Sequence, residues 1–140
     1  MKIVSFGDVH MATRNLARMD AVMHDTDLVI VSGDLTNFGG SDDAATVIGE
    51  VRRACRRVLA LPGNLDRGEV IPFLEREGVA LHGRGAIIDG VAIFGCGGSN
   101  ITPFETPTEF SEAEIYEILV RGYAEVRDAR PLLMICHTPP

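Results

Sequence analysis

Residues 2–10 read Lys2-Ile-Val-Ser-Phe-Gly-Asp-Val-His10, an apolar run that ends in a glycine, a carboxylate and an imidazole. Similar apolar runs recur at residues 28–31, 58–61 and 132–135. All four are short, nearly continuous and rich in branched residues, which is typical of strands covered on both faces of a parallel or mixed sheet. The sequence therefore predicts four sheet strands that are buried on both sides.

Helical patterns come after each of the first three strands. Apolar residues recur at helical spacing within residues 13–24, 42–57 and 69–77. Ser41 is a good N-cap for the second of these helices, and Gly78 ends the third. Alternation of strands and helices indicates the α/β class, with parallel strands.

The second half of the chain adds antiparallel pairing and one clear helix. Asp89-Gly90 stands between apolar runs at residues 86–88 and 91–94, which predicts a two-residue hairpin. Ser111-x-x-Glu114 is a capping-box pattern, and an apolar helical face continues from it to Val126. The chain then enters its last predicted strand, so we expect one domain over residues 1–140.

Composition limits the function classes. The chain has 140 residues, 13 Lys and Arg against 20 Asp and Glu, and a formal net charge of -7. Its 46% hydrophobic and 24% charged content is that of an ordinary globular domain, which excludes a wholly disordered chain. The acidic balance disfavours nucleic acid and anionic lipid as partners.

The cysteines and apolar runs bear on location. Cys55, Cys96 and Cys136 are far apart and form no Cys-x-x-Cys pair, which favours a reducing compartment. The first apolar run is too short for a signal peptide, and no run approaches the ~20 residues of a membrane span. We expect a cytoplasmic protein with no membrane partner, and we expect Cys96 and Cys136 to be packed thiols rather than nucleophiles.

Residues that can bind metal come after each of the four strands. They are Asp8 and His10 after the first, Asp34 after the second, Asn64 after the third and His137 after the last. The carboxyl ends of parallel strands meet at one edge of a sheet, where α/β proteins bind ligands. Taken singly, each of these residues is more often a turn or strand-end residue, but together they predict a site.

The donor set indicates the chemistry of that site. Two carboxylates, two imidazoles and one amide suit Mn, Fe, Zn or related ions rather than a thiolate site. Asp34 is the natural bridging ligand, because its strand would be flanked by the others. Two ions bridged at ~3.5–4 Å are the arrangement used for in-line attack on phosphorus.

In this order, Asp8-x-His10, Gly33-Asp34, Gly63-Asn64 and His137 resemble the motif series of calcineurin-like metallophosphoesterases. The resemblance implies a β-sandwich flanked by helices (αββα) and a centre with two divalent metal ions. It implies that Asp8 and His10 hold the first ion, that Asp34 bridges, and that Asn64 and His137 hold the second. Manganese is the expected metal, with Fe, Zn, Ni and Mg as alternatives.

One departure concerns the third motif. The family usually has Gly-Asn-His followed by Asp or Glu, whereas this chain reads Gly63-Asn64-Leu65-Asp66. The missing histidine normally faces the leaving group of the phosphate ester, and leucine cannot donate a proton. His24 and His82 are not obvious replacements, and we expect both at the surface.

The other departure concerns the end of the sequence. The family has a Gly-His-x-His motif after its histidine strand, whereas this sequence ends at Pro140, three residues after His137. The resemblance therefore implies the N-terminal portion of a metallophosphoesterase-like domain, an incomplete copy of the fold. For such a chain we expect incomplete metal occupancy and weak or no activity.

The leading functional hypothesis is a phosphoesterase that hydrolyses small phosphomonoesters or phosphodiesters through a metal-bound hydroxide. Asp34 and Asn64 would act at the metals, and Asp66 would orient site groups. The alternative is a non-catalytic scaffold on the same fold, as in the retromer scaffold subunit, which also lacks that histidine. The retained ligands favour the enzyme, whereas Leu65 favours the scaffold. A nuclease is disfavoured by the acidic composition, and a homo-oligomer is left open.

Overall fold

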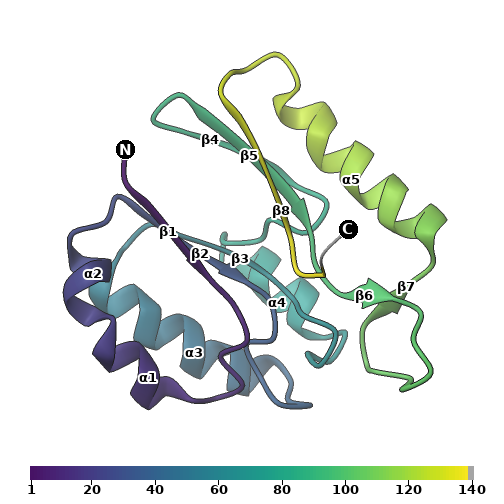
Figure 1. The fold of residues 1–140 in the computed structure, drawn as a ribbon, viewed down its shortest axis with the longest axis horizontal. Coiled ribbons are helices and arrows are strands. Elements are labelled where there is room, and N and C mark those ends of the chain that lie inside the picture. Colours follow the sequence, from purple (N-terminus) through teal and green to yellow (C-terminus); the bar gives the residue numbers. More distant parts are fainter. Residues whose placement is uncertain (139–140) are drawn as a thin grey trace.

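The computed structural model describes residues 1–138. Two sheets pack face to face in it, and helices cover the outer face of each sheet (Figure 1). Residues 139 and 140, the end of the expected single domain, lie outside the described residues. The first sheet is parallel and consists of β1 (Ile3–Phe6), β2 (Leu28–Ser32) and β3 (Val58–Leu61), with β2 in the centre. Three of the four predicted strands therefore form one sheet.

The register of this sheet aligns its strand ends. Phe6 pairs with Val31, and Val31 pairs with Ala60, so the three carboxyl ends lie at one edge. The loops that carry Asp8, Asp34 and Asn64 start from that edge, as the sequence predicts.

The second sheet contains β4 (Gly85–Ile88), β5 (Val91–Cys96) and β8 (Leu132–Cys136) in that order. β4 and β5 form the expected antiparallel hairpin, whose turn has φ 48° at Asp89 and φ 84° at Gly90. β8 pairs with β5 in parallel, and a short pair, β6 (Ser99–Asn100) and β7 (Glu109–Phe110), extends beyond it.

Five helices cover the outer faces within the described residues. α1 (Thr13–Arg18), α2 (Asp20–His24), α3 (Ser41–Ala54) and α4 (Val70–Arg76) pack on the first sheet, and α5 (Glu112–Val126) packs on the second (Figure 1). Between the sheets lies a core formed by Leu28, Ile30, Leu59, Leu61, Leu81 and Ile93. This is the helix-flanked sandwich that the resemblance implies.

Two helix predictions need correction. The sequence predicts one helix over residues 13–24, but Met19 has ψ -1° and separates α1 from α2. Both pieces pack against α3, and each buries an apolar side chain there, Leu16 from α1 and Met23 from α2. Ser41 is the first residue of α3 rather than its cap, and its amide donates to the Glu69 carboxylate at 3.2 Å.

The prediction of strands buried on both faces is right for β2 and β3 and wrong for β1 and β8. β1 is half-buried, and in β8 Leu133 and Met134 are 36% and 54% exposed. In the described part of the chain β1 and β8 each lie at an edge of their sheet, whereas β3, also at an edge, is covered by the bridge between Ala60 and Ala80. Apolar composition alone does not distinguish an outer strand from a central one.

None of the helices within residues 1–138 is both long enough and apolar enough to span a bilayer.

Candidate metal centre

The loops after β1 and β2 are held together by backbone hydrogen bonds beyond the ends of the strands. The Asp8 amide donates to the Gly33 carbonyl, and the His10 amide donates to the Asp34 carbonyl, both at 3.0 Å. The loop after β3 joins them, because the Leu65 amide donates to Oδ1 of Asp34 at 2.9 Å. Three separate loops therefore meet at Asp34.

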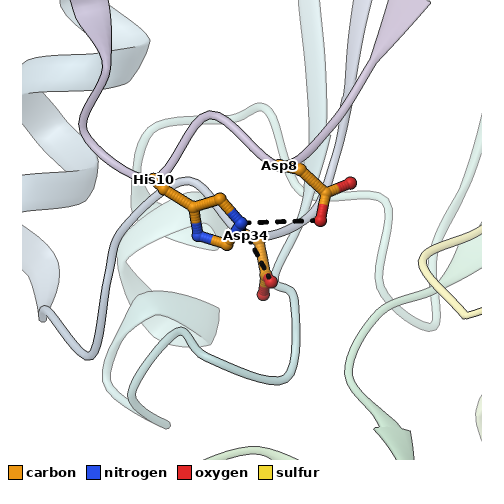
Figure 2. A group of neighbouring side chains, drawn as sticks. All are labelled: Asp8, His10 and Asp34. Atoms are coloured by element: carbon orange, nitrogen blue, oxygen red, sulfur yellow. Dashed lines mark ion pairs between the residues drawn. The ribbon is translucent and has the colours of Figure 1, made fainter.

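One group of candidate ligands contains Asp8, His10 and Asp34, and Figure 2 shows one ring nitrogen of His10 directed toward both carboxylates. Nε2 of His10 lies 3.6 Å from Oδ1 of Asp8 and 3.8 Å from Oδ2 of Asp34. One ligand atom from each residue lies within 4.8 Å of the others. This spacing leaves room for one cation among the three side chains.

A second group lies on the other side of the same carboxylate. Nε2 of His137 is 3.5 Å from Oδ1 of Asp34 and 3.0 Å from Oδ1 of Asn64. His137 comes directly after β8, so the second sheet contributes to this group while the first sheet supplies Asp34 and Asn64. The structure thus brings all five sequence-predicted ligands together around Asp34.

Both imidazoles are oriented in the same way. Nδ1 of His137 lies 2.9 Å from the Ser32 carbonyl, and Nδ1 of His10 lies 3.3 Å from the Thr36 carbonyl. A carbonyl only accepts, so Nδ1 is the donor in each contact, and in the neutral imidazole Nε2 then presents a lone pair. A histidine whose Nδ1 donates to a backbone carbonyl is the usual form of a metal-binding histidine.

The donor set fits divalent cations. In the neutral ring the Nε2 lone pair of His137 faces the amide oxygen of Asn64 and a carboxylate oxygen of Asp34, so three acceptors converge among the described residues. Such an arrangement requires either an added proton or a cation. Mixed nitrogen and oxygen ligands without thiolate suit Mn, Fe, Zn and similar ions.

Asp34 is the buried centre of the site, with only 3% of its surface exposed. Burial raises the pKa of its carboxyl group above the ordinary value, and the Leu65 amide and the nearby His137 partly oppose that shift. A cation on either side would favour the ionised form, because an opposite charge at this range lowers a carboxyl pKa.

Asp66 lies behind the ligands rather than among them. It is fully buried, and its carboxylate accepts from the amides of Gly63, Leu35 and Thr36 at 2.7, 3.1 and 2.8 Å. The Thr36 hydroxyl donates to it as well, at 2.7 Å. Asp66 therefore ties the loop after β3 to the loop after β2 and fixes the positions of Asn64 and Asp34.

The backbone around the site is unusual. Asp8, His10 and Asp34 have φ values of 55°, 46° and 48°, in the left-handed region that L-residues rarely adopt. Such conformations persist only where surrounding contacts impose them, and they concentrate at functional sites. Gly63 is required here because a Cβ atom at this position would collide with the Asp34 carboxylate.

His82 corrects one expectation. The sequence places it at the surface, but it is 7% exposed, its Nδ1 accepts from the Gly97 amide at 3.0 Å, and its ring lies 5.3 Å from that of Phe110. Its segment pairs with β5 at Gly95, which carries it into the interior. Burial lowers the pKa of His82 to about 4. His24 is exposed, as expected.

The thiols do not form part of the site chemistry. Cys96 and Cys136 occupy opposite positions on the neighbouring strands β5 and β8, and both are free thiols. Burial raises the pKa of Cys96 to about 12, which leaves the thiol protonated and unreactive. Both residues line a groove of about 910 Å³ beside α5, together with Ile115, Leu119, Met134 and His137.

Sequence reasoning misses Thr106, which contacts a predicted ligand. Nδ2 of Asn64 lies 3.2 Å from the Thr106 hydroxyl. Thr106 belongs to the segment between β6 and β7, which the sequence shows only as a polar loop. Its threonines and Glu109 carry no motif, so no local pattern identifies this contact.

Comparisons with known proteins agree with this geometry. The sequence model of the family described as calcineurin-like phosphoesterase matches residues 1–140. The uncharacterized protein MJ1162 of Methanocaldococcus jannaschii is 33% identical over 140 residues, which are all of this chain and 62% of that protein. The chain therefore spans less than two thirds of this relative's length.

Solved structures share the fold. TT1561 of Thermus thermophilus superimposes with a TM-score of 0.79 at 19% identity, covering 99% of this chain and 68% of that one. The phosphopantetheinyl hydrolase PptH of Mycobacterium tuberculosis gives a TM-score of 0.62 at 14% identity, with coverage of 99% and 68%. With the whole chain matched by the family, and with its sandwich and strand-end motifs in place, this protein belongs to the calcineurin-like phosphoesterases.

Proposed function

We propose that this protein hydrolyses small phosphate esters at a centre of two divalent cations. The proposed ligands are Asp8, His10, Asp34, Asn64 and His137. The observation that carries the proposal is the position of Asp34, whose Oδ2 faces His10 while its Oδ1 faces His137. One carboxylate with its two oxygens directed to separate ligand groups suits a bridge between two cations.

When bound, such cations supply an activated water molecule and neutralise the charge that develops on the phosphate. The residues of the chain hold the geometry. Asp34 and Asn64 present oxygens to the centre, and Asp66 keeps their two loops in register through its buried carboxylate. We propose manganese as the preferred metal, with Fe, Zn, Ni and Mg as alternatives.

The site offers little help to a departing alcohol from position 65. Leu65 directs its backbone amide to Asp34, and its side chain has no proton to donate. We therefore propose activated monoesters or diesters as the best substrates. The net charge of -7 does not favour nucleic acid. The free thiols support a cytoplasmic location.

A non-catalytic scaffold on the same fold is the second candidate, and Leu65 is the feature that favours it. Against it, both imidazoles keep the Nδ1-to-carbonyl bonds that orient a metal ligand. A surface used only for protein contacts would not require them. The two functions differ in whether cation binding leads to turnover.

The test is hydrolysis of aryl phosphates. Full-length protein loaded with Mn²⁺ is assayed with p-nitrophenyl phosphate and bis(p-nitrophenyl) phosphate. We expect turnover by the wild type and none by Asp34→Asn. Asp20→Asn, which alters an exposed carboxylate of α2, should retain activity. Binding of two cations without turnover of either ester would favour the scaffold instead.

A further inference from the structure

The Asn64 side chain is held at both ends. Its Oδ1 faces Nε2 of His137 at 3.0 Å, and its Nδ2 faces the hydroxyl of Thr106 at 3.2 Å. An amide has a donor end and an acceptor end of nearly equal size, so the two orientations fill the same space. Whatever fixes the orientation decides whether an oxygen or an NH₂ group is presented to the centre.

The Thr106 hydroxyl has its single proton committed elsewhere. It donates to Oε1 of Glu109 at 2.6 Å, which leaves only lone pairs for the Asn64 side. The Asn64 end that meets Thr106 must therefore be the NH₂ group, since two acceptors would repel each other. The hydrogen-bond chain runs in one direction, from Asn64 to Thr106 to Glu109.

Glu109 sets that direction because an ionised carboxylate can only accept. It receives hydrogen bonds from the amide and hydroxyl of Thr102 and from the amide of Thr106, besides the Thr106 hydroxyl. These bonds, the Thr102 hydroxyl first, lower the pKa of Glu109 to about 2. The carboxylate is therefore ionised across the working pH range.

The same loop is attached to the backbone of the site. The Thr108 amide donates to the Asn64 carbonyl at 3.1 Å, and the Thr108 hydroxyl donates to the Asp66 carbonyl at 2.5 Å. The segment that carries Thr106 thus cannot move away from Asn64 without breaking buried bonds.

Resting on the proposed function, we infer that Thr106 and Glu109 are positioning residues that orient the Asn64 amide, so that its oxygen faces the cation beside His137. Thr106 contacts the ligand directly, and Glu109 acts through Thr106. Partners that orient a metal ligand in this way typically change metal affinity about 10–100-fold when they are removed. Within the described residues Asp8 and His10 make no hydrogen bond to Thr106 or Glu109, so a cation held by them would lie outside this chain of hydrogen bonds.

The test compares Thr106→Val, which keeps the shape and removes the hydroxyl, with Thr106→Ser, which restores it. Mn²⁺ binding is measured by calorimetric titration on the full-length protein, and folding by thermal unfolding. We expect Thr106→Val to weaken one of the two Mn²⁺ sites about 10-fold or more and to leave the other unchanged. Thr106→Ser should bind as the wild type does. Thr46→Val, at an exposed position of α3, is the matched control.

A double-mutant cycle separates orientation of Asn64 from general support of the loop. In an Asn64→Ala background Thr106→Val should cause no further loss of Mn²⁺ affinity, because the amide it orients is gone. An equal loss in both backgrounds would overturn the inference, as would wild-type affinity at both sites in Thr106→Val. Glu109→Gln, whose side-chain amide can also donate, should weaken the same site.

A metal-free measurement gives an independent readout. In the wild type the Asn64 side-chain NH₂ group donates to Thr106, so its proton NMR signals should shift in Thr106→Val and recover in Thr106→Ser. Unchanged signals in Thr106→Val would also overturn the inference. Failure of the wild type to bind two Mn²⁺ ions is a different result, since it would overturn the proposed function itself.

Discussion

Nε2 of His137 lies 3.5 Å from Oδ1 of Asp34, although Asp34 belongs to the loop after β2 of the first sheet and His137 to the segment after β8 of the second. The other oxygen of the carboxylate, Oδ2, faces His10 at 3.8 Å. A single buried side chain therefore lies between ligands from two sheets. Its position depends on residues that support the loops from behind, and substitutions there should disturb both folding and cation binding.

Asp66→Ala should destabilise the fold strongly. The change leaves the amides of Gly63, Leu35 and Thr36 without an acceptor in the interior. Each buried unsatisfied donor costs about 1–3 kcal/mol, so we expect a loss of about 3 kcal/mol or more in the free energy of unfolding. Urea denaturation measures it. Asp25→Ala breaks only an exposed pair with Lys2 and should leave the free energy of unfolding nearly unchanged.

Gly63→Ala should abolish cation binding. The added methyl group would occupy the space of the Asp34 carboxylate and its backbone nitrogen, so the two loops could not keep their present contact. Gly68→Ala is the control, because a Cβ atom there meets nothing within 4 Å. Mn²⁺ titration of both variants provides the measurement. Wild-type binding by Gly63→Ala would show that the contact between the two loops is not required for the site.

Stability should fall as the pH drops from about 6.5 to about 4, with His82 as one cause. Burial holds its folded pKa near 4 while the unfolded value is 6.5, so the unfolded chain binds the proton first. The full effect is about 3 kcal/mol, present above pH 6.5 and lost towards pH 4. His82→Asn keeps an acceptor for the Gly97 amide and should flatten this slope in denaturation curves. An unchanged slope would assign it to other groups.

Leu65→His should accelerate esters with poor leaving groups more than those with good ones. General acid catalysis contributes about 10²–10⁴-fold where the departing alkoxide is basic, and little where it is not. The measurement is kcat/KM across aryl and alkyl esters of graded leaving-group pKa for both proteins. Parallel dependences would mean that leucine instead shapes an apolar part of the pocket, and KM for the native substrate should then rise in the variant.

The sequence predicts correctly those turns and helix ends that depend on only a few neighbouring residues. Asp89-Gly90 gives the expected hairpin, and Ser111 with Glu114 forms the expected capping box, because each needs only a few neighbouring residues. The common edge of β1, β2 and β3 results from parallel pairing, which explains how strand-end residues indicated the site. These features depend little on the rest of the chain.

Long-range contacts explain the failures. His82 is buried because its segment pairs with β5 and its ring packs near that of Phe110. Both partners are distant in sequence, so the residues around His82 do not indicate them. The exposure of Met134 depends on the place of β8 within its sheet. The contact between Thr106 and Asn64 depends on how the loop that carries Thr106 folds back onto Asn64. That loop has no regular periodicity, so no sequence pattern predicts the contact.

The packing of the two sheets has a consequence for the site. Asp34 is attached to one sheet and His137 to the other, so the thickness of the layer between the sheets sets how far apart these side chains lie. Ile93 and Leu61 are completely buried in that layer, remote in sequence from either ligand. The apolar interior thus acts as a spacer for the polar centre. Removal of a methyl group from this layer should change the distance between Asp34 and His137.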